Sequence, residues 1–248
     1  MHLPWLQPGD PFPDPTHAWD QKQPAPGLLA AGGALDVDSL QRAYARGIFP
    51  WFSEGQPILW WSTDPRMVLS TGEFRLHRSL RKTIARFAAD PRCEIRFDSD
   101  FDAVIQACAT SDRPGQSGTW IVPAMVQAYR AFHRAGFAHS VETWIDGQLA
   151  GGLYCVVLGR AVFGESMFTN VPDASKIALA ALVAWSRAHE VPAIDCQQNT
   201  RHLASLGARE IPRAEFVQQV ALQARRPPAP WRFEPVYWNA ILPDPRSA

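Results

Sequence analysis

A carboxylate and an amide stand two residues apart at the end of an apolar segment, at Asp195 and Gln197. Because residues 191–194 before them are mostly apolar, the segment is typical of a buried strand. Alternation along a strand predicts Asp195 and Gln197 on one face and Cys196 on the other. The pair could share a hydrogen-bond network and handle a proton at a reacting group, or it could satisfy backbone groups at a strand end.

Cys196 raises a second possibility, a thiol nucleophile with a histidine as its base. The candidate bases are His139, His189 and His202. No local signature supports this chemistry, and a lone cysteine in a buried strand is usually a small core residue. We therefore interpret Cys196 as part of the core.

Glu165 is a charged residue within the apolar segment 163–168. If it points inward it needs a cationic partner, since an unpaired buried carboxylate is costly. That partner could be an arginine of the protein or the amine or guanidinium of a ligand. Five apolar residues could line a pocket beside Glu165 or pack as core: Leu153, Val162, Met167, Leu179 and Leu182.

Four tryptophans are candidate platforms on which a nucleic-acid base could stack. The alternative for each is burial in a core or a domain interface. No glycine pattern of a P-loop or a dinucleotide site is present. The four candidates are Trp51, Trp60, Trp61 and Trp120.

The composition indicates a folded protein. Of 248 residues, 46% are apolar and 19% are charged, which excludes a disordered tail protein. The longest apolar run, 177–185, is too short to cross a bilayer, and the Pro-rich start does not resemble a secretory signal. Four scattered cysteines without a CxxC pair argue against a zinc knuckle or a disulfide framework. We expect a cytoplasmic protein without membrane association or bound metal.

The charge is zero overall but unevenly distributed. The 24 basic and 24 acidic residues cancel, which by itself argues against a nucleic-acid partner. Residues 66–96, however, carry eight bases against three acids, a net charge of +5. The ordinary explanation of such a run is a solvated helix face.

A domain junction is predicted near Asp64, after a dense aromatic stretch. This gives an N-terminal domain of residues 1–64 with a Pro-rich arm, and a second domain of residues 65–248 that ends in another Pro-rich arm. The first domain is expected to contain a short helix, with Asp38 or Ser39 as its N-cap.

The second domain combines helical and alternating patterns. An Asp146-Gly147 pair between two alternating segments is a strong hairpin signal. Helices that lead into an antiparallel meander, followed by helix, strand and helix, indicate an α+β fold. We expect helices over 76–88, 101–109, 123–135, 174–188, 200–206 and 213–224, and strands over 140–145, 148–158, 161–168 and 192–197.

Several strings of this chain together resemble the leucyl/phenylalanyl-tRNA–protein transferase family. They occur in the family's order over nearly the whole chain, and aromatic-rich strings of this length are highly specific. The matching strings are Gly27–Ala30 with Gly32-Gly33, Tyr44–Phe52, Ile58–Ser62, Gly118–Ile121, Gly151–Tyr154, Phe163–Phe168, Ala174–Lys176, Ile194–Gln197 and Ser205–Ala208.

The resemblance implies a small N-terminal domain joined to a GNAT-like acyltransferase domain with a mixed, largely antiparallel sheet flanked by helices. It implies an enzyme that moves Leu or Phe, and less efficiently Met, from its tRNA to the N-terminal Arg or Lys of a protein. This transfer marks the acceptor for the N-degron pathway. The implied partners are leucyl-tRNA, phenylalanyl-tRNA and such acceptors, and the implied enzyme is a monomer without a cofactor.

The resemblance also implies site residues. Trp51 and Trp120 match residues that hold the terminal adenosine of the tRNA. Glu165 matches the acid near the acceptor's basic terminus, and Asp195 and Gln197 match the pair assigned to chemistry. The pocket for the aminoacyl side chain is matched by Leu153, Met167, Leu179 and Leu182.

Two positions depart from the family, because Leu153 replaces an expected Met and Leu182 an expected Phe. The preference between Leu and Phe therefore stays open. The basic segment follows the aromatic stretch directly in the sequence, so it becomes a candidate phosphate-contacting surface. Its candidate residues are Arg75, Arg78, Arg81, Lys82 and Arg86.

An aminoacyl ester is already activated, so no covalent nucleophile is required. Gln197, oriented by Asp195, is expected to hydrogen-bond the incoming α-amine, while Glu165 pairs with the acceptor's cationic side chain. A neutral amide is a poor base, so Gln197 could position the amine rather than deprotonate it.

Two alternatives stay open. An N-acetyltransferase that uses acetyl-CoA needs a phosphate-binding turn, and the nearest string, 148–153, departs from that pattern at its last place. A non-catalytic tRNA-binding module would use the basic segment and the tryptophans, but it gives no role to Asp195 and Gln197.

Overall fold

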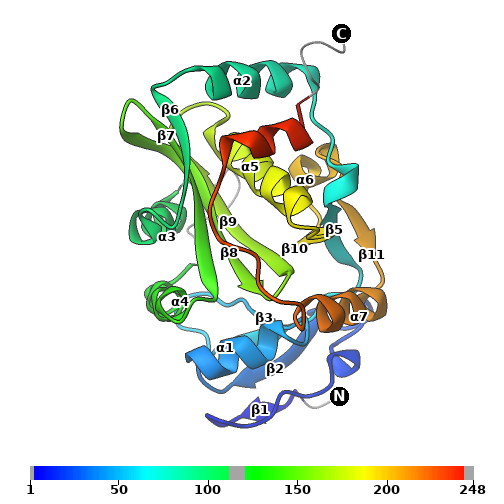
Figure 1. Ribbon diagram of the computed structural model, residues 1–248. Helices are drawn as coiled ribbons and strands as arrows, with labels where there is room; N and C mark the ends of the chain where they lie inside the picture. Colours follow the sequence, from blue (N-terminus) through cyan, green and yellow to red (C-terminus); the bar gives the residue numbers. More distant parts are fainter. Residues whose placement is uncertain (1–2, 112–120, 243–248) are drawn as a thin grey trace.

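The computed structural model describes residues 3–111 and 121–242 and shows an α+β chain built on two sheets (Figure 1). The smaller sheet has the strand order β1-β2-β4-β3, and the larger has the order β11-β5-β10-β9-β8-β7-β6. The strands of the smaller sheet come from residues 5–61, and those of the larger come from residues 66–211.

The smaller sheet is formed by short, aromatic-rich strands. Its two longest strands, β2 and β4, pair antiparallel, with Ala30 opposite Trp60. Trp60 is fully buried, and its indole N–H donates to the Gly32 carbonyl at 2.9 Å. The strands are β1 (Trp5–Leu6), β2 (Leu28–Gly32), β3 (Phe49–Pro50) and β4 (Leu59–Trp61).

Helix α1 (Val37–Tyr44) begins earlier than the sequence indicated. Asp36, rather than Asp38 or Ser39, is the N-cap. Its backbone is extended, and its carboxylate accepts the backbone N–H of Ser39 at 2.7 Å. This satisfies one of the unpaired donors of the first turn. Gly47, with a φ of 71°, follows the helix end and turns the chain towards β3.

The larger sheet is mixed and mostly antiparallel. β9 and β10 run parallel, and its other described strand pairs run antiparallel. Asp146 and Gly147 both have positive φ in the turn between β7 and β8, so the hairpin prediction is confirmed. The strands are β5 (Arg66–Ser70), β6 (Cys93–Phe97), β7 (Ala138–Ile145), β8 (Gln148–Leu158), β9 (Ala161–Thr169), β10 (Ala193–Gln197) and β11 (Arg209–Ile211).

Helices cover both faces of the larger sheet (Figure 1). The core with α5 contains Leu153 and Cys155 of β8, while the core with α3 and α4 contains Tyr154 between them. The predicted helices are all present, with small shifts at their ends. They are α2 (Arg78–Ala89), α3 (Phe101–Thr110), α4 (Pro123–Arg134), α5 (Ala174–Ala188), α6 (Arg201–Ser205) and α7 (Arg213–Gln223), with 3₁₀ turns η1 (Pro15–His17), η2 (Thr71–Glu73) and η3 (Pro235–Ala240).

The parts of the chain on either side of Asp64 share a hydrophobic core. Tyr44 of α1 packs edge-on against Phe163 of β9, with ring centroids 5.1 Å apart, and both belong to one buried cluster. The C-terminal arm crosses α5, where the Trp185 indole donates to the Pro230 carbonyl at 3.0 Å. Within the described chain, no helix combines the length and the apolar character needed to span a membrane.

Candidate active site

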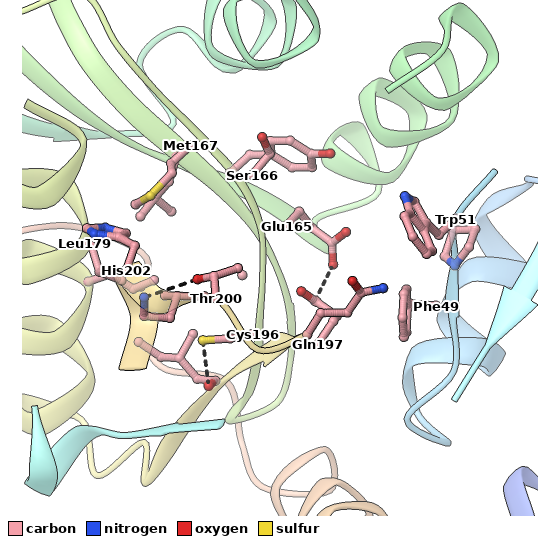
Figure 2. Close-up of a pocket in the computed structure, with 18 residues that line it drawn as sticks. Phe49, Trp51, Glu165, Ser166, Met167, Leu179, Cys196, Gln197, Thr200 and His202 are labelled. Carbon is pink, nitrogen blue, oxygen red and sulfur yellow. Dashed lines mark hydrogen bonds between the residues drawn. The ribbon is translucent and has the colours of Figure 1, made fainter. Parts of the chain in front are cut away.

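A cavity of about 340 Å³ lies where β3, β8, β9, β10, α5 and α6 meet (Figure 2). Side chains of β8, β9 and α5 form an apolar end. The residues around β3, together with Glu165 and Gln197, form a polar and aromatic end. In Figure 2, Glu165 and Gln197 point towards one another between Trp51 on one side and Met167 on the other. The volume is within the usual range of small-molecule sites.

Four of the five apolar residues expected in a pocket line this cavity. Leu153 on β8 lies opposite Met167 on β9. Val162 does not line the cavity. It pairs with Val157 near the start of β9 and is 3% exposed. Because a strand rises about 3.3 Å per residue, Val162 lies too far along β9 to reach the space beside Met167. The lining residues of the expected set are Leu153, Met167, Leu179 and Leu182.

Trp51 is the tryptophan that lines the cavity among those the structure describes. The Trp61 indole donates to the Trp51 carbonyl at 2.7 Å, and the two rings pack with centroids 5.4 Å apart. Trp60 is fully buried and cannot serve as a stacking platform. Trp120 lies outside the described residues. One aromatic surface is therefore held at the polar end by a neighbouring ring.

Glu165 reaches the cavity from β9, and its carboxylate has neutral partners. Tyr44 of α1 donates to Oε1 at 2.8 Å, and Tyr129 of α4 donates to Oε2 at 3.1 Å. The Gln197 side-chain amide donates to Oε1 at 3.5 Å (Figure 2). Burial raises the pKa of Glu165 to about 8, and the two phenol hydrogen bonds offset this only in part. The sequence suggested an arginine as one possible partner of Glu165. In the described chain its hydrogen-bond partners are two tyrosines and a glutamine instead.

Asp195 has the opposite surroundings. Arg66 of β5 donates to both carboxylate oxygens, from Nε at 2.8 Å and from Nη2 at 2.7 Å. The two side chains are 0% and 1% exposed. The guanidinium also lies over the rings of Phe49 and Phe216, at 4.6 and 4.5 Å. A buried, bidentate pair with this geometry anchors β10 to β5. Asp195 does not line the cavity.

A bulge in β10 separates Asp195 from Gln197. The register against β5 shifts between them, and Gln197 has a φ of 54°. Asp195 therefore lies in the interior, while Cys196 and Gln197 both line the cavity. The prediction that Asp195 and Gln197 share a face is wrong, because it assumed a regular strand. The two remain linked, since the backbone N–H of Gln197 donates to Asp195 Oδ1 at 3.0 Å.

Cys196 is not activated as a nucleophile. Burial raises the pKa of its thiol to about 12, and Asp195 adds to this effect. His202 lines the same cavity, whereas His139 is hydrogen-bonded to Asp98 and His189 to Tyr237. A thiol that stays protonated at neutral pH cannot attack an ester efficiently.

Three residues of the site were not expected as functional residues from the sequence: Arg66, Tyr44 and Tyr129. Arg66 was counted in the basic segment, although it precedes the buried apolar residues 67–69. A cation in an otherwise buried strand was the available signal. The two tyrosines gave none, because a tyrosine in a helix usually packs as core. Their phenols lie 121 and 36 residues from Glu165 in the chain.

The basic segment does not form one surface. Arg66 is buried, and Arg92 and Arg96 pair with Asp90 and Glu94. The five candidate phosphate contacts are exposed on α2 and the turn before it, and none forms an ion pair within the described chain. Although the segment follows Trp51 closely in sequence, α2 lies at the opposite end of the molecule from α1 and β3 (Figure 1). The five are Arg75, Arg78, Arg81, Lys82 and Arg86.

Two other chemistries find no place in the cavity. Among the described residues, Asp98, His133 and His139 have potential metal-ligand atoms within 4.8 Å of one another. His139 is hydrogen-bonded to Asp98 and His133 to the Ala138 carbonyl, each at 2.7 Å, and none of the three lines the cavity. Residues 148–153, considered as a phosphate-binding turn, form part of strand β8.

Two sequence models of one family match this chain. The model described as leucyl/phenylalanyl-tRNA protein transferase matches residues 68–221, and the model of the N-terminal domain of that family matches residues 33–64. The matches divide close to the cis Asp64-Pro65 peptide bond.

Curated proteins named leucyl/phenylalanyl-tRNA–protein transferase are similar over nearly their whole length. The protein of Polaromonas sp. (strain JS666) is 66% identical over 97% of this chain and 94% of its own. The protein of Albidiferax ferrireducens is 61% identical over 97% and 94%, and that of Burkholderia pseudomallei (strain 668) is 57% identical over 99% and 96%. A functionally unknown conserved protein from Staphylococcus epidermidis has a TM-score of 0.36 at 8% identity over 75% of this chain and 68% of its own, which supports no conclusion.

Proposed function

The chain belongs to the leucyl/phenylalanyl-tRNA–protein transferase family and is an aminoacyltransferase, and we propose that it moves Leu or Phe, and less efficiently Met, from aminoacyl-tRNA to the N-terminal Arg or Lys of acceptor proteins. The product is a substrate of the N-degron pathway. We place the enzyme in the cytoplasm as a monomer that needs no cofactor. We also propose that residues 1–64 form an N-terminal domain, packed through a shared core against a GNAT-like catalytic domain of residues 65–248.

The observation that supports this function is the composition of one cavity. Its apolar end fits an uncharged side chain, Trp51 offers a ring on which the terminal adenine can stack, and Glu165 offers a carboxyl group that is hydrogen-bonded by neutral groups in the described chain. An aminoacyl-adenosine carries an apolar side chain and an adenine ring that match the first two features. The cationic N-terminus of a basic acceptor matches Glu165. We assign the second adenosine contact to Trp120, on the basis of the family resemblance.

The apolar end favours unbranched or γ-branched side chains. Leu153, Met167, Leu179 and Leu182 present methyl and methylene groups and one thioether to this space. A pocket of this kind discriminates by only about 1–3 kcal/mol per methylene, so overlap among Leu, Phe and Met follows. We expect Val and Ile to be excluded by their branch at the β-carbon.

The chemistry is aminolysis of an activated ester, which depends mainly on placement. Gln197 lies in the cavity beside Glu165, and its side-chain oxygen can accept a hydrogen bond from the α-amine of the acceptor. Asp195 holds the backbone of Gln197 and does not reach the cavity, so we assign it a positioning role. Glu165 receives the cationic N-terminal residue of the acceptor.

The test is a transfer assay with a labelled donor. A peptide that begins with Arg is mixed with the protein and either labelled leucyl-tRNA or labelled acetyl-CoA, and a matched peptide that begins with Ala is the control acceptor. We expect label from leucyl-tRNA on the Arg peptide alone. Transfer from acetyl-CoA, or from neither donor, would contradict the proposal, and equal labelling of both peptides would remove the acceptor specificity.

A further inference from the structure

Glu165 closes a ring of hydrogen-bonding contacts with two phenols. Tyr44 contacts Oε1, Tyr129 contacts Oε2, and the hydroxyls of Tyr44 and Tyr129 contact each other. Each contact needs one proton between its two oxygens. The two phenols supply two protons for three contacts. The ring is therefore complete only when the carboxylate holds the third proton.

The groups around Glu165 favour the uptake of that proton at neutral pH. Burial raises its pKa to about 8, with a smaller upward effect from Asp195 of β10. The hydrogen bonds from Tyr44 and Tyr129 and the charge of Arg66 of β5 lower it. Burial also raises the pKa of both phenols well above its usual value, so neither releases its own proton. Glu165 is thus the member of the ring that exchanges a proton with the cavity.

The other titratable groups near the polar end are not suited to this task. Asp195 is held by two hydrogen bonds from Arg66 and lies outside the cavity. The Cys196 thiol is held protonated by burial. His202 lies beside Leu179, on the side of the cavity away from Trp51 (Figure 2). Glu165 alone combines access to the cavity with contact to Gln197, the expected amine-binding side chain.

We propose that Glu165 is the catalytic base that removes a proton from the α-ammonium group of the acceptor, and that Tyr44 and Tyr129 are positioning residues that set its proton affinity. This inference rests on the proposed function. The acceptor binds as an ammonium ion opposite the ionised form of Glu165, which is the minor form at pH 7 and the major form above pH 8. One proton passes to Glu165 and completes the ring, and the freed lone pair attacks the ester carbonyl carbon.

The remaining steps balance without a co-reactant. The C–N bond forms and the C–O bond to the ribose breaks, while a second proton of the amine passes to the departing ribose oxygen. The products are the extended protein, tRNA with a free hydroxyl and protonated Glu165, which returns its proton to water. An α-amine has an ordinary pKa of about 7.7–8.0, close to that of Glu165, so the first transfer is nearly balanced in energy.

The experiment compares wild type with Glu165→Gln in single-turnover transfer from leucyl-tRNA to an Arg peptide between pH 6.5 and 9.0, corrected for ester hydrolysis. At pH 7 we expect a rate about 100-fold lower in the variant, the size of a typical general-base contribution. The ratio of wild-type to variant rate should fall about tenfold by pH 9, because solvent then deprotonates the amine. Glu54→Gln, on an exposed acid that does not line the cavity, is the control and should match wild type.

A role for Glu165 that is limited to pairing with the arginine side chain, without proton transfer, gives the opposite trend. The guanidinium stays charged and Glu165 becomes more ionised above pH 8, so the ratio would stay level or rise with pH, and either result overturns the proposal. A peptide that begins with citrulline separates the two roles again. We expect Glu165→Gln to slow transfer to this peptide as well, and a loss confined to the Arg peptide also overturns the proposal.

The two phenols supply a test that does not depend on Glu165→Gln. Tyr44 and Tyr129 both hydrogen-bond the Glu165 carboxyl group, so Tyr44→Phe and Tyr129→Phe should move the acidic limb of the wild-type profile. Slower transfer with an unmoved limb would mean that the phenols only support the fold and would overturn the assignment. If wild type itself transfers no Leu at any pH, the proposed function fails first.

Discussion

Asp195 and Glu165 lie on the neighbouring strands β10 and β9, yet their carboxylates meet different partners. Asp195 accepts two hydrogen bonds from Arg66 with both side chains sealed from solvent. Glu165 faces a cavity and is bonded only by neutral groups among the described residues. The cations divide in the same way, since Arg66 is buried while the five candidates around α2 are exposed and unpaired within the described chain. The buried pair of Arg66 and Asp195 stabilises the fold. Glu165 and the basic residues around α2 are accessible from the cavity or the surface.

The largest expected effect on stability comes from removing one partner of the buried Arg66–Asp195 pair. Arg66→Met or Asp195→Asn alone leaves a buried group without its partner, and the free energy of unfolding should fall by about 3–5 kcal/mol. The double variant Arg66→Met with Asp195→Leu removes both charges and should recover most of this loss. Urea unfolding measures all three. Single variants within 1 kcal/mol of wild type would show that the pair does not anchor the fold.

Glu165→Gln should instead raise the free energy of unfolding. Burial raises the pKa of Glu165 from 4.5 to about 8, so its contribution to stability is full below about pH 4.5 and is lost as the pH rises to 8. The variant should therefore be more stable than wild type by a few kcal/mol at pH 8.5, and the difference should shrink towards pH 5. Thermal or urea unfolding at both pH values checks this. A variant that is less stable than wild type at pH 8.5 would mean that Glu165 stabilises the fold as Asp195 does.

Leu182→Phe tests the apolar end of the same cavity. Leu182 is fully buried and lines the cavity, so the larger ring should shift the ratio of Leu to Phe transfer by about tenfold in a competition between the two charged tRNAs. Leu222→Phe, on a residue that is 68% exposed, is the matched control. An unchanged ratio would remove Leu182 from the donor pocket.

The smallest effect for each residue is expected on α2. Replacement of Arg78 or Arg81 by Ala should weaken tRNA binding modestly and lower the slope of log affinity against log salt by about one per phosphate contact. Arg92→Ala is the control, because Arg92 is already paired with Asp90. Affinities between about 50 and 200 mM salt give the slopes. Equal slopes for all three variants and wild type would leave α2 as an ordinary solvated face.

The helices and the hairpin were accessible from the sequence because they follow from periodicity and turn residues over short distances. The surroundings of the two acids were not. Asp195 meets Arg66 across 129 residues of chain, and Glu165 meets Tyr44 across 121, so no local pattern distinguishes the buried, paired acid from the one that faces the cavity. Val162 was misplaced for a related reason, since apolar character does not reveal how far along a strand a cavity extends.

The bulge in β10 also limits how this site could be transplanted. A regular strand that carried the string Asp195–Gln197 would present the acid and the amide on one side and so lose the division between interior and cavity. The extra residue rotates the strand, so that Asp195 faces the interior while Gln197 faces the cavity. A designer who grafts the site onto another scaffold must copy the irregular backbone, with Gln197 at its positive φ, before any of the side chains.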